Sequence, residues 1–77
     1  MGKLVVINGV KKELSISIDN ESLDIYVDNG DQHEPTHICY WHLDEVVEDA
    51  EVSISMINAV KLYYTEPQKL INILSIK

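Results

Sequence analysis

An Asn-Gly pair near the start of the chain strongly constrains the fold of its first half. Asn8-Gly9 follows the apolar run Leu4-Val5-Val6-Ile7 and precedes residues 14–18, where apolar and polar side chains alternate. Asn-Gly favours a type I′ turn, because both central residues of that turn need positive φ. Residues 3–18 are therefore predicted to form a β-hairpin. The apolar residues of its second strand are expected on one buried face: Leu14, Ile16 and Ile18.

Two further strands are predicted before the middle of the chain. Residues 19–22 have the composition of a turn, and residues 23–27 alternate again between apolar and polar. A polar loop at 28–32 leads through Pro35 to a fourth strand over residues 36–41. Short strands joined by turns predict an antiparallel four-stranded β-meander with one solvated face.

The segment after the strands is ambiguous between helix and strand. Residues 51–56 alternate strictly, which would suit a fifth strand over 51–57. Helical spacing also fits the same region, on the stripe Ile54, Ile57, Val60 and Tyr64. A helix over about 53–64 is favoured, and the acidic residues at 44–49 suit the start of a helix.

A last helix is predicted near the C-terminal end of the sequence. Thr65 and Gln68 have the spacing of a capping box, and Pro67 falls in the first turn, where its missing N–H is harmless. Leu70, Ile71 and Leu74 then form an apolar stripe. The predicted fold class is α+β: a single domain over residues 1–77, with the four-stranded meander followed by a C-terminal helical segment.

The chain length and the number of cysteines indicate how large the core is and in which compartment the domain is expected. A chain of 77 residues buries a small core, and a single cysteine excludes an internal disulfide. A lone thiol suits a reducing compartment, so a cytoplasmic location is expected. No signal-peptide pattern and no apolar stretch of about 18 residues is present, so we expect neither secretion nor a membrane span.

The charges are unevenly distributed along the chain. The net charge is −7, all six basic residues are Lys, and none of them lies between Glu13 and Val60, a stretch that carries twelve of the thirteen acids. Direct binding of nucleic acid is not expected, because neutralising phosphates requires clustered cations. The acidic surface either keeps the domain solvated or meets a basic protein partner.

The side chains best suited to bind a metal ion or to act as a nucleophile are clustered in the sequence. All three histidines and the only cysteine lie within ten positions: His33, His37, Cys39 and His42. Zinc prefers thiolate and imidazole ligands, so a metal site is a candidate. The simpler alternative, which the pattern favours, is a small apolar cysteine in the core with histidines bonded to nearby acids.

Strand geometry limits which of these residues can share a metal ion. Side chains alternate between faces, so one face is expected to carry His37, Cys39 and Trp41, and the other Ile38, Tyr40 and His42. His33 could join from the loop, whereas His42 would need the strand to end or bulge near Trp41. The candidate ligand set is therefore His33, His37 and Cys39, with His42 optional.

A cysteine-dependent enzyme is less favoured than a binding module. Cys39 is expected in mid-strand, away from a helix N-terminus and among acids that raise the pKa of a thiol. No glycine-rich elbow or oxyanion-hole loop is visible in the sequence.

The stretch from Leu23 to Trp41 resembles a group of small uncharacterised bacterial domains whose signature is a strand that runs into H-x-P-P-H-x-H. His33, Pro35 and His37 match that signature, whereas Thr36 replaces its second proline and Cys39 its third histidine. The resemblance covers about a quarter of the chain. It implies a small α+β domain of bacterial type, often encoded near toxin–antitoxin-like or mobile-element genes, and it assigns no activity.

Two functional hypotheses follow. The first is a non-catalytic protein-interaction domain, either a homodimer or a domain that docks on a basic partner; the apolar run from Leu70 to Ile76 is its candidate interface. The second is a metal-binding domain, or a small metal-dependent enzyme, with zinc at His33, His37 and Cys39.

Overall fold

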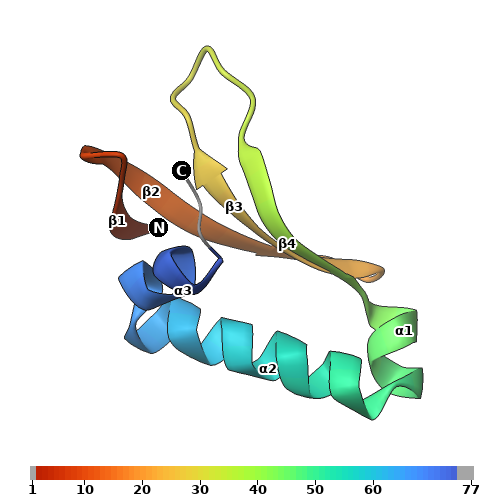
Figure 1. The fold of residues 1–77 in the computed structure, drawn as a ribbon. Helices are drawn as coiled ribbons and strands as arrows, with labels where there is room; N and C mark the ends of the chain where they lie inside the picture. Colours follow the sequence, from red (N-terminus) through yellow and green to blue (C-terminus); the bar gives the residue numbers. More distant parts are fainter. Residues whose placement is uncertain (1, 75–77) are drawn as a thin grey trace.

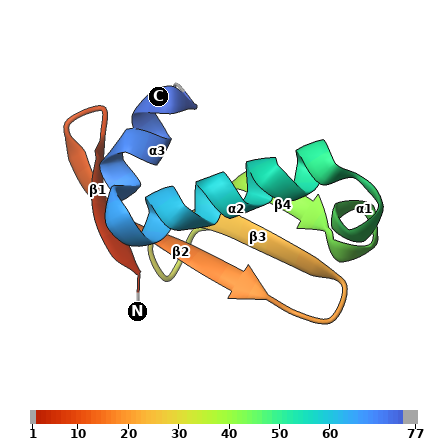
Figure 2. The same ribbon diagram turned by 90° about the horizontal axis from the view of Figure 1, so that it is seen from below.

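The computed structural model describes residues 2–74, in which an antiparallel sheet is covered on one face by helices (Figure 1). The sheet has the order β1-β2-β3-β4, with strands Lys3–Ile7, Val10–Ile18, Ser22–Asp28 and Thr36–His42. Three helices follow: α1 (Leu43–Glu48), α2 (Ala50–Thr65) and α3 (Pro67–Ile73). The predicted α+β fold and four-stranded meander are confirmed. Figure 2 shows α2 lying across the sheet, with α3 beside β1.

The hairpin at the start of the chain forms as predicted. Asn8 has φ of 52° and Gly9 has φ of 78°, the positive values that a type I′ turn requires. Ile7 pairs with Val10 next to this turn. The turn thus fixes the register of β1 on β2.

The core lies between the inner face of the sheet and the helices. Leu14 and Ile25 are fully buried, and the helices contribute Tyr63 and Leu70 to the same cluster. The prediction that Ile18 is buried with Leu14 is wrong, since Ile18 is 63% exposed. Strand β1 begins at Lys3, opposite Leu14, so the residues of β2 after Leu14 have a neighbouring strand on one side only.

Residues 51–57 are helical, which settles the ambiguity against a fifth strand. Asp49 begins α2 as its N-cap, because its side chain accepts hydrogen bonds from the backbone N–H groups of Glu51 and Val52. The helix packs on the sheet through Ala59 and Tyr63. Most of the predicted stripe lies on the opposite face instead, with Ile54, Ile57 and Tyr64 exposed.

Helix α3 begins at Pro67 as expected, but the predicted capping box is wrong. Thr65 is the last residue of α2, and its hydroxyl donates to the carbonyl oxygen of Lys61. Gln68 binds the backbone of Val6 in β1 instead. Leu70 and Ile71 are buried; Ile73 and Leu74 are exposed, and the end of the predicted interface at Ile76 lies outside the described residues.

None of the helices within residues 2–74 has the length and apolar character needed to cross a membrane.

Candidate functional site

A bulge in β4 separates the residues of the His/Cys cluster. Ile25 pairs with Cys39 and its neighbour Tyr26 pairs with His37, so the pairing skips Ile38. Such an extra residue interrupts the alternation of side chains along a strand. The prediction that His37 shares a face with Cys39 is therefore wrong.

Beyond the bulge, the alternation follows the prediction. Cys39 and Trp41 point to the inner face and pack against the core, as does the bulged Ile38. Tyr40 and His42 lie on the outer face, where their rings meet edge to face with centroids 5.0 Å apart. His37 joins this outer face, because its partner Tyr26 alternates with the buried Ile25.

The centre of the outer face is an acid–imidazole pair. His37 Nδ1 is hydrogen-bonded to Asp24 Oδ2, and the ring of Tyr26 lies 6.1 Å from the His37 ring. The Asp24 side chain is only 14% exposed, whereas His37 is 60% exposed. The second carboxylate oxygen of Asp24 is buried and has no hydrogen-bond partner among residues 2–74. The pair thus anchors β4 to β3 across the solvated face.

The four candidate metal ligands occupy three different places. His33 is exposed in the loop before β4, where its backbone N–H donates to the carbonyl oxygen of Gly30. His37 and His42 lie on the outer face and Cys39 on the inner face. Within residues 2–74, no three His, Cys, Asp or Glu side chains are close enough to hold one ion. The arrangement does not fit the zinc site that the sequence suggested.

The Cys39 thiol lies in surroundings that keep it protonated. Burial raises its pKa above the ordinary value, and the negative charge of Asp24 raises it further. Because the thiolate is the reactive form, a raised pKa makes the thiol a poor nucleophile at neutral pH. Cys39 therefore contributes as an apolar side chain.

An apolar groove opens between the inner face of β4 and the two helices α2 and α3. Its volume is about 530 Å³. Cys39 and Trp41 form its wall on the sheet, and Ile54, Ile73 and Leu74 line it from the helices. Ile54 and Ile73 are 59% and 60% exposed, which is high for isoleucine next to a cavity. Most of the groove's lining is therefore apolar.

One end of this groove is acidic. Glu51, in the first turn of α2, lines the groove itself. A separate, smaller hollow of about 340 Å³ between α1 and α2 is lined by Glu45, Glu48, Asp49 and Val52. The N-terminal end of α2 therefore carries negative charge both in the groove and in the separate hollow next to α1.

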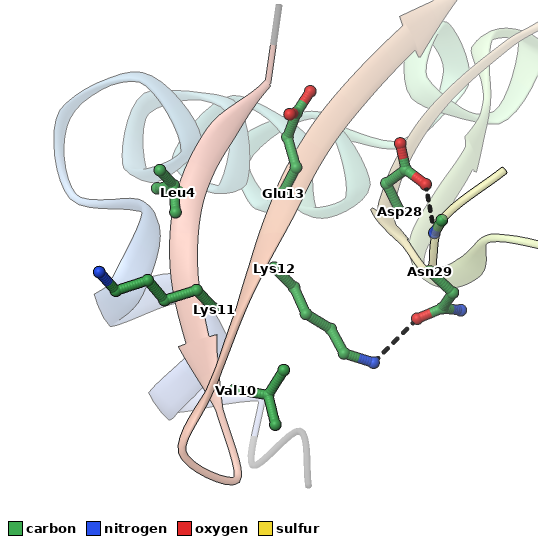
Figure 3. A pocket seen from close by; sticks show the side chains of 8 residues that line it. Leu4, Val10, Lys11, Lys12, Glu13, Asp28 and Asn29 are labelled. Carbon is green, nitrogen blue, oxygen red and sulfur yellow. Dashed lines mark hydrogen bonds between the residues drawn. The ribbon is translucent and has the colours of Figure 1, made fainter.

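A third hollow, of about 450 Å³, lies at the other end of the sheet and is drawn in Figure 3. There the Lys12 ammonium donates to Asn29 Oδ1 at 3.0 Å, and the Gly30 backbone N–H donates to Asp28 Oδ1 at 2.9 Å. These polar groups bond to one another and fasten the β3–β4 loop to β2. We assign this hollow a structural role.

The two edges of the sheet differ. At the β1 edge, the side-chain amide of Gln68 bonds both the N–H and the C=O of Val6. Strand β4 forms the opposite edge, and among the described residues no other segment hydrogen-bonds its outward backbone groups. An unpaired edge beside an apolar groove is a common setting for protein contacts.

Comparison of the chain with protein-family models, curated proteins and solved structures found no match. The site is therefore assigned from geometry alone. The groove itself was not predicted from the sequence, although the run from Leu70 to Ile76 was named as a candidate interface. Leu70, Ile73 and Leu74 of that run line the groove, together with Ile54 from the weakly charged α2.

Proposed function

We propose that this chain is a non-catalytic protein-interaction domain that binds its partner through the groove between β4, α2 and α3. The observation that carries the proposal is the exposure of Ile54, Ile73 and Leu74 around one apolar hollow. Exposed apolar side chains are normal when scattered, but a contiguous set around a concave surface marks a site of contact.

The charges around the groove indicate which side chains the partner should carry. Glu51 and the acids of α1 favour a partner that carries lysine or arginine where it meets this end. The largely apolar lining near Trp41 favours an apolar anchor from the same partner. The lone thiol suits a cytoplasmic setting for this contact.

The alternative, a metal-binding domain or small metal-dependent enzyme at His33, His37 and Cys39, has less support. The bulge at Ile38 places His37 and Cys39 on opposite faces of the sheet. The raised pKa of the Cys39 thiol also opposes its use as a nucleophile.

Affinity capture with matched variants tests the proposal. The tagged chain is compared with Ile73→Ser/Leu74→Ser in the groove and with Leu4→Ser/Tyr40→Ser outside it; all four residues are exposed apolar side chains. A partner should be retained by the original chain and the control and released by the groove variant. Trp41, the only tryptophan, lines the groove, so its emission should shift when the purified partner is added.

The proposal fails if every retained protein also binds the groove variant, or if Trp41 emission is unchanged by a partner that binds. Melting curves of both double variants establish that the comparison is between folded proteins.

A further inference from the structure

The exposed side of α2 does not have the composition of a solvent-facing helix. Of its 16 residues, only Glu51 and Lys61 are charged. Besides these two charges and the polar Ser55, Asn58 and Thr65, the exposed side carries large apolar side chains, with Ile54 at 59%, Ile57 at 49% and Tyr64 at 57% exposure. A helix covered on one side by a sheet normally presents charged residues on the other. This face, which meets the groove at Ile54, therefore has fewer charges than a free helix surface normally carries.

The two charges of α2 stand at opposite ends of this face. Glu51 is in the first turn, and Glu48 and Asp49 precede it, so the N-terminal end is acidic. Lys61 lies in the last turns, and the Lys3 ammonium is 5.7 Å from the ring centroid of Tyr64 at the same end. The helix thus runs from negative to positive charge along an apolar stripe.

A charge gradient of this kind is complementary to itself when two copies lie antiparallel. Glu51 and Lys61 are equally distant from Met56, at about 7 Å on either side along the helix axis. A twofold axis that crosses the exposed face at the level of Met56 would set Glu51 of each copy opposite Lys61 of the other. Ile54 and Ile57 flank the same axis and would be buried between the helices. An interface about a twofold axis requires such self-complementarity.

From this arrangement we propose that the partner of this domain is a second copy of the same chain, bound through antiparallel packing of α2 on α2. The inference rests on the proposed function and names its partner. An extended basic partner would suit the acidic end of the stripe but would meet Lys61 and Lys3 at the other. A second copy complements both ends, and it keeps the acidic ends of two molecules with a net charge of −7 apart.

Light scattering coupled to size exclusion, together with charge exchange, tests this inference on the full chain. The original chain should have twice the 8.8 kDa mass of one copy at micromolar to millimolar concentrations. Glu51→Lys and Lys61→Glu should each weaken dimerisation about tenfold or more, since each sets two pairs of like charges across the interface. The matched controls Glu34→Lys and Lys11→Glu make the same changes at exposed positions off this face and should dimerise normally.

Mixing the two single variants gives the sharpest result. The Glu51→Lys variant has lysine at positions 51 and 61, and the Lys61→Glu variant has glutamate at both. Opposite charges therefore meet at both contacts between the two variants, so the mixture should form a heterodimer. The double variant Glu51→Lys/Lys61→Glu should likewise recover the homodimer. Recovery in either case also shows that the single variants are folded.

Three outcomes overturn the inference. They are a chain that stays monomeric at millimolar concentration, single variants that dimerise like the original chain, and a mixture that does not recover dimerisation. If a monomeric chain still retains a different protein through the groove, the proposed function stands and only the second copy is wrong. If it retains none, both proposals fail.

Discussion

Gln68 and Val6 are joined by two hydrogen bonds, although they lie 62 residues apart. The Val6 N–H donates to Gln68 Oε1 at 2.7 Å, and Gln68 Nε2 donates to the Val6 carbonyl oxygen at 3.0 Å. A side-chain amide reproduces the donor and acceptor of a peptide unit, so Gln68 occupies the place that a further strand would take. The contact ties α3 to the β1 edge.

Replacing this glutamine should loosen the attachment of α3. We expect Gln68→Ala to lower the free energy of unfolding by about 1–2 kcal/mol, because two hydrogen bonds at an exposed edge are exchanged for bonds to water. Asn72→Ala is the control, since Asn72 accepts from Gln68 at 3.2 Å but has no hydrogen bond to β1 among residues 2–74. Urea unfolding measures both variants, and equal losses would contradict the assigned role of Gln68.

The Cys39 thiol should react slowly in the folded protein at neutral pH. Its pKa is raised by burial and by Asp24, so the thiolate population is small and access is partly blocked. Alkylation by iodoacetamide should be faster in urea than in buffer, and faster in Asp24→Asn than in the original chain at equal pH. A folded thiol that reacts as fast as a free cysteine would contradict this environment.

The free energy of unfolding should fall in alkaline solution, between pH 9 and 11. Burial raises the pKa of Tyr63, and Tyr64, Glu13 and Tyr26 raise it further. The folded state therefore holds the phenol proton more tightly than the unfolded state. The contribution of the neutral Tyr63 phenol to the free energy of unfolding is fully present below the ordinary tyrosine pKa of about 10. It is lost as pH rises from there through the raised pKa. Tyr63→Phe should show a smaller loss between pH 9 and 11 in urea unfolding. The control is Tyr40→Phe, because Tyr40 is exposed and is not among the groups that act on Tyr63.

The Asp24–His37 pair should show energetic coupling. His37→Ala leaves a carboxylate that is only 14% exposed without its partner, so it should destabilise more than the exposure of His37 suggests. In a double-mutant cycle with Asp24→Ala, we expect a coupling energy of about 0.5–1 kcal/mol, since the imidazole is accessible to water. Additive losses would show that the pair contributes nothing to stability.

Zinc binding should be weak and insensitive to Cys39. The bulge at Ile38 prevents His37 and Cys39 from reaching one ion, so calorimetric titration should find no stoichiometric zinc site. Cys39→Ala should leave any residual binding unchanged. One zinc per purified chain that both His37→Ala and Cys39→Ala abolish would instead establish the metal-binding alternative.

The sequence predicted those parts of the fold that depend on local geometry. Asn8 and Gly9 have the positive φ that the predicted type I′ turn requires. The alternation in residues 23–27 corresponds to burial of Leu23, Ile25 and Val27 in the core. The bulge at Ile38 has no such local signal, because neither proline nor glycine marks it. It arises from how β4 pairs with β3, and that pairing decides the faces of the His/Cys cluster.

Helix α2 shows why the candidate site was harder to predict than the fold. Apolar residues surround this helix, with Met56 and Ala59 on the packed side and Ile54 and Ile57 on the exposed side. Periodicity alone cannot choose between two apolar faces. Only the position of the sheet shows which face remains uncovered.

The different treatment of the two sheet edges limits how large an assembly of this domain can become. A protein with two open edges accepts a neighbour on each side, and pairing of that kind can continue into a fibre. Here the amide of Gln68 fills one edge at Val6. A neighbour that paired with β4 would therefore find no free backbone groups at Val6 on the opposite edge, which opposes continued growth by strand pairing. A chain without Gln68 would lose its two hydrogen bonds to Val6, and the backbone groups of Val6 would then be open to pairing with another strand.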